Sequence, residues 1–266
     1  MTLEEIYKET EYSDIVYNIN GVPIPLDSKW TNIGIAVSGG ADSALLCYIL
    51  CKLITDNNLN IEVHVISNIR GWKNKPWQRQ NSLDVYNYIC QEFPNITFKR
   101  HENFVPPEFE WGDKGPTLVD EYGKNVSGDN IELRAFAEYI GHSEQLDAYY
   151  NAVTRNPKSI NIGNAMPTRN LEPSVENAKL MIMPHMKLTA CHPFRFIEKD
   201  WIVNTYRLLD QLELFDITRS CEGDITTRSE IFVDLDYRTY IPGQLVPICG
   251  RCFWCQERKW GWTNAK

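Results

Sequence analysis

The chain has 266 residues, of which 43% are hydrophobic and 23% are charged, and these values predict a globular protein with a sizeable core. The sequence has no unbroken apolar window of roughly 18 residues, the length of a membrane span, and its first residues lack the features of a secretion signal. We therefore expect a soluble, cytoplasmic protein with no membrane partner. The formal net charge of −8 argues against a broad nucleic-acid-binding surface.

The first 30 residues precede the first segment to which we assign chemistry. Alternating apolar residues in Ile15–Ile19 and Gly21–Ile24 predict a short hairpin or edge pair. The β-branched run Ile33–Val37 is typical of a buried parallel strand, and apolar residues then recur at helical spacing over Leu45–Leu53. A tight turn therefore connects a strand to a helix.

The turn reads Ser38-Gly39-Gly40-Ala41-Asp42-Ser43. Two adjacent glycines let successive backbone N–H groups converge on an anion, and the dipole of the following helix favours negative charge there. The segment lacks the lysine of G-x-x-x-x-G-K-[ST] and the third glycine of G-x-G-x-x-G, so neither of those nucleotide motifs applies. The sequence predicts a pyrophosphate-binding loop, with an ordinary capped turn as the alternative.

This loop resembles the S-G-G-x-D-S loop of the PP-loop ATP pyrophosphatases, which split ATP into AMP and pyrophosphate to adenylate a carbonyl-type oxygen. The resemblance implies that ATP and Mg²⁺ bind at the loop, with Ser38, Asp42 and Ser43 among the catalytic residues. Gly39, Gly40 and Ala41 would bind the nucleotide through their backbone. We expect Asp42 to cap the helix or to hold the metal shell.

A second strand over Ile61–Ile66 completes a β-α-β unit. It predicts an α/β fold with a doubly wound, mostly parallel sheet, like that of the adenine nucleotide alpha hydrolases. Ligands bind beyond the carboxyl ends of such strands, so Ser67–Arg70 are candidates to contact adenine and ribose, with a plain loop as the alternative. We expect a helix over Trp77–Phe93 and a third strand over Ile96–His101. Arg79 resembles a recurrent basic position of PP-loop enzymes.

The middle of the chain gives weaker signals. Phe104–Gly128 is long for a connection and predicts a lid or a partner-binding loop. Asn130–Ala152 predicts a helix, with a break at Gly141 left open. Ser159–Asn164 predicts a fourth strand whose end opens on the same crevice, so Gly163 is a candidate to approach the ligand, with a turn chosen for backbone reasons as the alternative.

Four of the eight cysteines have the spacing of a metal site, a single cysteine followed later by C-x2-C-x2-C. Such spacing lets thiolates converge on one ion at about 2.3 Å and favours a closed structural Zn²⁺ site. An iron–sulfur cluster is the main rival, because C-x2-C-x2-C also occurs in ferredoxins. The candidate ligands are Cys221, Cys249, Cys252 and Cys255. The others, in apolar patterns, should be buried: Cys47, Cys51, Cys90 and Cys191.

The segments around these cysteines sharpen the resemblance. Lys199 at the start of a helix, the run Thr218–Cys221, and the terminal C-G-x-C-x2-C with a following arginine resemble QueC, the 7-cyano-7-deazaguanine synthase family of queuosine biosynthesis. The resemblance implies a zinc site made by the four cysteines. It also implies ATP-dependent conversion of a 7-carboxy-7-deazaguanine with ammonia, through an acyl adenylate and an amide, to the nitrile. Lys199 would bind phosphate or carboxylate.

We divide the chain into an N-terminal extension (1–30), a PP-loop nucleotide-binding domain (31–220) and a zinc-binding region (221–266). Three alternatives stay open. A QueC-like ligase would join the carboxylate to an amine on a partner protein or other molecule, in a nucleic-acid-modification or antiviral system. A PP-loop tRNA thiolase would share the loop, although the acidic charge speaks against it. A non-catalytic zinc module would explain the cysteines alone. A protein partner and a homodimer also stay open.

Overall fold

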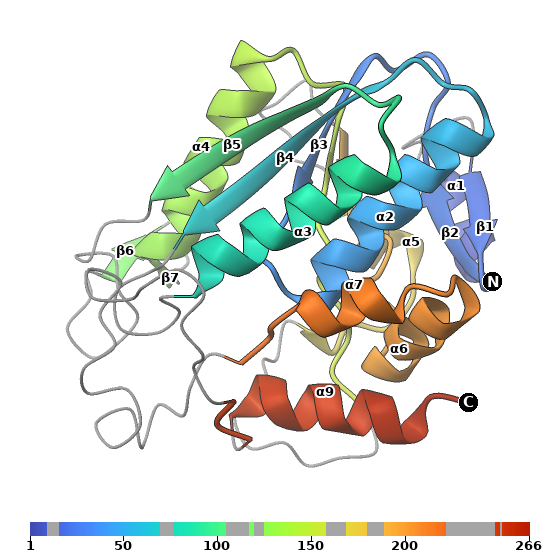
Figure 1. Cartoon of the computed structure of the whole chain (residues 1–266), viewed down its shortest axis with the longest axis vertical. Coiled ribbons are helices and arrows are strands. Elements are labelled where there is room, and N and C mark those ends of the chain that lie inside the picture. The colour runs from blue at the N-terminus through green and yellow to red at the C-terminus, as the bar shows by residue number, and fades with distance from the viewer. Residues whose placement is uncertain are drawn as a thin grey trace.

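A five-stranded parallel sheet forms the centre of the protein in a computed structural model of the chain (Figure 1). The strand order is β5-β4-β3-β8-β9, and every neighbouring pair is parallel. The strands are β3 (Asn32–Ala36), β4 (Glu62–Ile69), β5 (Phe98–Phe104), β8 (Ala148–Tyr150) and β9 (Thr189–Cys191). The structure describes residues 1–9, 16–69, 77–104, 117–119, 125–157, 169–179, 189–221, 248–250 and 252–266.

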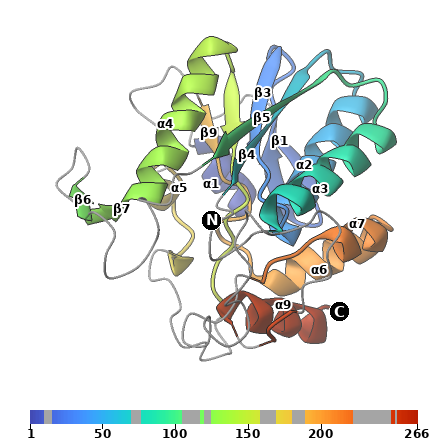
Figure 2. The same cartoon turned by 60° about the vertical axis from the view of Figure 1, so that its left-hand side comes forward.

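Helices cover both faces of this sheet (Figure 2). On one face, α2 (Ala41–Asp56) and α3 (Gln78–Glu92) pack on Val63 and Val65 of β4. On the other face, α4 (Gly128–Ser143) packs on Ile66 of the same strand. Side chains alternate along a strand, so odd-numbered residues of β4 face α2 and α3 and even-numbered residues face α4. The predicted α/β fold with a doubly wound, parallel sheet is confirmed.

The direction of winding reverses beside β3. From β3 the chain passes through α2 and α3 to β4 and β5, and it then returns through α4 to β8 on the opposite side of β3. In open parallel sheets, ligands bind outside the carboxyl ends of the strands at such a reversal. The glycine loop that follows β3 is therefore at the position where this architecture places a ligand.

Smaller elements surround the sheet. The predicted hairpin is confirmed as β1 (Val16–Ile19) and β2 (Val22–Pro25), which pair antiparallel through a turn in which Asn20 and Gly21 have positive φ. A second antiparallel pair consists of β6 (Thr117–Val119) and β7 (Asn125–Ser127). Helix α1 (Leu3–Glu9) packs against the hairpin and against α5 (Val175–Lys179).

Three helices from the end of the chain gather beyond the carboxyl ends of the strands (Figure 1). They are α6 (Lys199–Leu208), α7 (Leu212–Ile217) and α9 (Phe253–Asn264), and Lys199 opens α6 as predicted. Helices α6 and α9 lie close enough that a Cβ at Gly261 would be 2.8 Å from the backbone oxygen of Lys199. Only glycine at this position lets the two helices approach so closely.

Two sequence predictions need correction. The helix expected over Asn130–Ala152 ends at Ser143, and Ala148–Tyr150 forms strand β8. Tyr149 packs on the α4 side and Tyr150 on the α2 side, which is the alternation of a strand, but a short apolar run does not reveal its period. Strand β4 also continues to Ile69, so Ser67 lies inside the strand and not after it.

Several predicted features lie outside the described residues. They are Arg70, Gly163, the strand expected over Ser159–Asn164, and most of the 104–128 segment. Within the described ranges, no helix has the length and hydropathy needed to cross a membrane.

We expect the start of β3 to depend on Asp147. Its carboxylate accepts hydrogen bonds from the backbone N–H groups of Thr31 and Asn32, at 2.7 and 3.1 Å. Asp147→Ala should lower the free energy of unfolding by about 1–3 kcal/mol, because both N–H groups lose their acceptor. Urea denaturation measures the loss. Asp56→Ala is the matched control, since Asp56 makes an exposed pair with Lys52 and its removal should cost less than about 1 kcal/mol. Equal losses would contradict the prediction.

Candidate functional site

The glycine loop is closed on itself by its two serines. Ser43 Oγ donates to the carbonyl of Gly40 at 3.1 Å and accepts from the backbone N–H of Ser38 at 3.2 Å. Ser38 Oγ lies 3.2 Å from Ser43 Oγ. Gly40 is the N-cap of α2, and no side chain in the described part of the molecule caps that helix. The first N–H groups of α2 therefore have no side-chain cap, and anion binding at this helix end stays a prediction.

Packing fixes Gly39 from two sides. Its φ of +79° is a backbone conformation that glycine adopts readily and other residues rarely adopt. A Cβ at this position would lie 2.8 Å from both Asn81 Cβ and Ser82 N at the start of α3. From the other side, the backbone N–H of Arg219 donates to the Gly39 carbonyl at 2.9 Å. The loop is therefore held between α3 and the segment that leads to Cys221.

Asp42 forms an ion pair with Lys199, so the structure brings together two of the residues predicted for the site. Lys199 Nζ lies 2.5 Å from Asp42 Oδ1 and also contacts Oδ2. The lysine is only 4% exposed. Charged residues are rarely buried without a partner, and Asp42 is the partner here. Asp42 does not cap α2 through its side chain, so the capping role expected for it is wrong, because the buried ammonium takes its carboxylate instead. A role in a metal shell stays a prediction.

The ion pair continues into a larger buried network that the sequence did not reveal. Glu257 on α9 is 1% exposed, and its Oε2 lies 3.3 Å from Lys199 Nζ. Its Oε1 accepts from Arg169 Nη2 at 2.5 Å, and Arg169 Nε donates to the Thr154 carbonyl at 2.7 Å. Thr154 Oγ1 completes the circuit by contacting Asp42 Oδ2 at 3.3 Å. Two acids and two bases thus balance one another; Lys199, Glu257 and Arg169 are buried, and Asp42 is partly exposed.

Aromatic rings of α9 help to hold this network. The Arg169 guanidinium lies 5.3 Å from the Phe253 ring centroid and 5.2 Å from that of Trp254. Glu257 could have been found from its place two residues after Cys255 in the last cysteine motif. Arg169 has no such signal, because it belongs to no sequence motif and reaches Glu257 across 88 residues.

The remaining predicted nucleotide contacts lie at different distances from the loop. Ser67 is buried, and its hydroxyl donates to the carbonyl of Val37 at 2.8 Å, so it supports the backbone that enters the loop. Arg79 lies in the first turn of α3 with an exposed side chain that pairs with Glu102, Nη2 to Oε2 at 3.0 Å. Ala41 is the buried first residue of α2.

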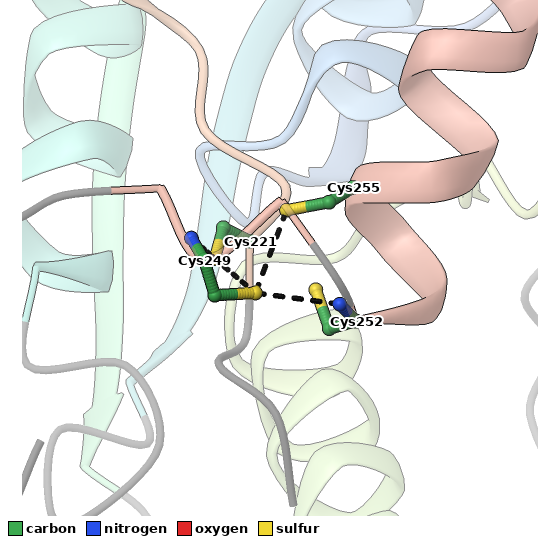
Figure 3. A group of neighbouring side chains, drawn as sticks. All are labelled: Cys221, Cys249, Cys252 and Cys255. Atoms are coloured by element: carbon green, nitrogen blue, oxygen red, sulfur yellow. Dashed lines mark hydrogen bonds between the residues drawn. The ribbon is translucent and has the colours of Figure 1, made fainter. Parts of the chain in front are cut away.

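The four predicted metal ligands come together from two parts of the chain (Figure 3). Their sulfur atoms lie within 4.8 Å of one another, with 3.5 Å between Cys221 and Cys249 and 3.8 Å between Cys249 and Cys255. A tetrahedral ion with bonds of about 2.3 Å separates its sulfur ligands by about 3.8 Å. All eight cysteines lie in the described ranges, and none forms a disulfide. The geometry therefore fits one metal ion.

The surroundings of the sulfur atoms agree with a cation. The backbone N–H groups of Cys249 and Cys252 point at the sulfurs of Cys221 and Cys249, at 3.4 and 3.3 Å, as in sites where second-shell donors stabilise thiolates. The neighbouring Cys221 and Cys252 thiols, together with burial, raise the pKa of Cys255 far above its ordinary value. Thiolates need a positive ion to coexist at this distance.

The cysteine group is linked directly to the glycine loop. Cys221 comes two residues after Arg219, whose N–H binds the Gly39 carbonyl. On the α9 side, Arg258 Nη1 donates to Thr218 Oγ1 at 2.9 Å, and Arg258 Nη2 donates to the Phe215 carbonyl at 2.8 Å. The segment from Thr218 to Cys221 is thus fixed at one end by the cysteines and along its length by the loop and α9.

Comparison with known proteins leaves the family open. No family model matches the chain, and no curated protein matches it. Among solved structures, the U34-tRNA thiolase NcsA from Methanococcus maripaludis with its [4Fe-4S] cluster is similar over 85% of this chain and 71% of its own, with 16% identity and a TM-score of 0.48. A likeness of this size does not bear on the activity of the present chain.

We expect Gly39 to tolerate no side chain. Gly39→Ala should destabilise the protein by about 1–2 kcal/mol for the positive φ and by about 1–3 kcal/mol more for the clash with α3. Gly21→Ala is the control, because Gly21 also has a φ of +79° but a Cβ there meets nothing within 4 Å. Thermal and urea unfolding of both variants measure the difference. A loss for Gly39→Ala no larger than that for Gly21→Ala would show that α3 does not confine the loop.

Proposed function

We propose that the protein is an ATP-dependent enzyme of the PP-loop type that adenylates a carboxylate and releases pyrophosphate and AMP. The observation that carries this proposal is the uncapped N-terminus of α2 behind a glycine loop, at the reversal point of a parallel sheet and beside a buried lysine. Such a site suits a polyanion, and the S-G-G-x-D-S sequence of the loop suits ATP. The structural likeness to the tRNA thiolase is not part of the support.

Adenylation asks the protein to position two reactants and to stabilise the leaving pyrophosphate. The backbone N–H groups of Ala41 and Asp42 supply donors at the start of α2, whereas the Gly40 N–H donates to Ser38 Oγ, and the Ser38 and Ser43 hydroxyls keep the loop in shape. These preformed dipoles need no rearrangement as negative charge moves onto the leaving group. The chain therefore holds the pyrophosphate, and the attacking carboxylate brings the nucleophilic oxygen.

Lys199 is the residue we assign to neutralise charge on phosphate or carboxylate. Its ammonium is already desolvated and contacts Asp42, the second residue of α2. Asp42 and Glu257 hold it there, so the side chain loses little further freedom when an anion binds. Asp42 also offers the hard oxygen donors that Mg²⁺ prefers, and that ion would neutralise phosphate charge.

For the substrate we propose a 7-carboxy-7-deazaguanine-like acid that reacts with ammonia through an amide to the nitrile, as the resemblance of both ends of the chain to QueC implies. A related ligase that joins the same acid to an amine on a partner protein or another molecule would use the same loop and lysine. A tRNA thiolase would activate a uridine oxygen in place of a carboxylate. The products distinguish these three reactions.

The expected outcome is cleavage of ATP between its α and β phosphates only when the acid is present. We would incubate the protein with ATP, Mg²⁺, ammonia and 7-carboxy-7-deazaguanine, and measure AMP, pyrophosphate and the product mass. A nitrile or amide product supports the synthase. Formation of AMP that depends on the acid, without an amide or nitrile product from ammonia, supports the ligase. Thiolated tRNA, formed with a sulfur donor, would support the thiolase. Absence of AMP with every substrate would overturn the proposal.

A pair of serine variants tests whether the loop carries the reaction. Ser43→Ala removes a hydroxyl that shapes the loop and should lower kcat/KM by about 100-fold. Ser143→Ala is the matched control, since Ser143 donates to the Ile140 carbonyl in the same way at the end of α4 and should leave the rate unchanged.

We also propose that Cys221, Cys249, Cys252 and Cys255 hold one structural Zn²⁺. Four sulfur atoms that all lie within 4.8 Å of one another, with two pairs at 3.5 and 3.8 Å, enclose the space of a single ion, whereas an iron–sulfur cluster would have to fit several atoms among its thiolates. Four protein ligands close the coordination shell, so the ion would hold the Thr218–Cys221 segment against the loop and not bind substrate.

The purified protein should contain about one zinc per chain and no inorganic sulfide. Cys252→Ser should lose the metal and much of its stability, because the cysteines connect α9 to the Thr218–Cys221 segment. Cys90→Ser, outside the cluster, should keep the metal. Elemental analysis and sulfide determination measure both points. Visible absorption with bound iron and sulfide would instead support a cluster.

A further inference from the structure

A second group of metal-ligating side chains lies on the α4 face of the sheet. His64 of β4 and His101 of β5 stack with ring centroids 5.2 Å apart and planes 4° from parallel. His64 faces α4 because it has the same parity as Ile66, and Glu144 follows the last residue of that helix. One ligand atom from each of His64, His101 and Glu144 lies within 4.8 Å of the others.

The ligand atoms are close to the spacing that a metal requires. His64 Nδ1 lies 3.0 Å from His101 Nε2 and 3.9 Å from Glu144 Oε2. Ligands about 2.0–2.1 Å from a tetrahedral Zn²⁺ are separated by about 3.3 Å, so shifts of a few tenths of an ångström would bring these three atoms into its shell. His64 is fully buried and fixed by the sheet, whereas His101 and Glu144 are partly exposed and open to an ion from solvent.

The other nitrogen of His64 faces a carboxylate at close range. Nε2 lies 2.9 Å from Glu62 Oε1, without the alignment of a hydrogen bond to any described residue. Histidines that bind metals usually donate their second N–H to a carboxylate, which fixes the tautomer and raises the basicity of the ligating nitrogen. A proton on Nε2, facing Glu62, leaves the Nδ1 lone pair directed at His101, and Nδ1 then accepts the hydrogen bond from His101 Nε2. A metal ion would replace this hydrogen bond, with the His101 proton moved to its Nδ1.

A lysine now supplies the positive charge beside this group. Lys99 Nζ lies 2.7 Å from Glu62 Oε1 and 3.0 Å from Glu144 Oε2. Its side chain is 48% exposed, so it can withdraw to solvent without a desolvation cost. The Lys99 ammonium, which is free to move, thus neutralises Glu62 and Glu144. A bound metal ion would take over this role, with Glu144 as its ligand and Glu62 behind His64.

From this geometry we propose that His64, His101 and Glu144 bind a divalent transition-metal ion, Zn²⁺ or a metal of similar preference, at a site separate from the four cysteines. Two imidazoles and one carboxylate are a common ligand set for such ions and leave a coordination position open. Lys99 competes with the ion and lowers its affinity. The site does not depend on the proposed enzymatic activity.

Cobalt(II) titration of the zinc-loaded protein tests the proposal. We expect one cobalt per chain in addition to the zinc, with visible d–d absorption and without the sulfur-to-metal charge-transfer band that a thiolate site gives. His101→Gln should abolish this binding and Glu144→Gln should weaken it. His142→Gln, an exposed histidine at the end of α4, is the matched control and should bind as the unchanged protein does.

The Lys99 variant separates a metal site from a merely structural histidine pair. Lys99→Gln removes the competing ammonium and should tighten cobalt binding by about tenfold. Circular dichroism of each variant checks that it is folded, and His64 itself is left intact because it is fully buried. The proposal is overturned if no second metal binds, if binding survives His101→Gln in the folded variant, or if Lys99→Gln leaves the affinity unchanged.

Discussion

The buried ion network of Asp42, Lys199, Glu257 and Arg169 is the constraint on which the site depends. It joins the first turn of α2, the first residue of α6, the middle of α9, and Arg169 with Thr154, which belong to distant parts of the chain. Removing one member of a buried ion pair costs about 3–5 kcal/mol, because the partner charge is left uncompensated. The network therefore fixes the positions of these elements relative to one another, and with them the position of the glycine loop that precedes α2.

A second set of contacts acts on the other side of the same loop. The Arg219 N–H fixes Gly39, and Arg258 and the cysteine group fix the segment in which Arg219 lies. Helix α9 contributes to both sets, through Glu257 to the ion network and through Cys255 and Arg258 to the cysteine side. A metal at the cysteines would then affect the loop without any contact with a ligand bound there, since it would fix the end of the segment that touches Gly39.

Much of this arrangement could be predicted from the sequence, and the failures have physical causes. The loop Ser38–Ser43, the parallel strands around it and the four converging cysteines follow from local signals, namely glycines at a turn, β-branched runs and thiol spacing. Strand β8 is not predicted from the sequence, because three apolar residues are too few to show a strand or helix periodicity. Its strand conformation comes from its pairing with β3 in the sheet. Arg169 was missed because a buried arginine at long range has no local signature.

Lys199 shows how the two levels combine. From the sequence it is a lysine in the first turn of a helix, a position where most lysines are solvated. Gly261 changes this, because without a side chain it brings α9 against the Lys199 backbone and places Glu257 over the ammonium. Lys199 then faces the carboxylates of Asp42 and Glu257, and Arg169 also pairs with Glu257. The ammonium is therefore held between two carboxylates. A phosphate entering at α2 would meet a cation that is already dehydrated and oriented, and it would compete for that cation with Asp42 and Glu257.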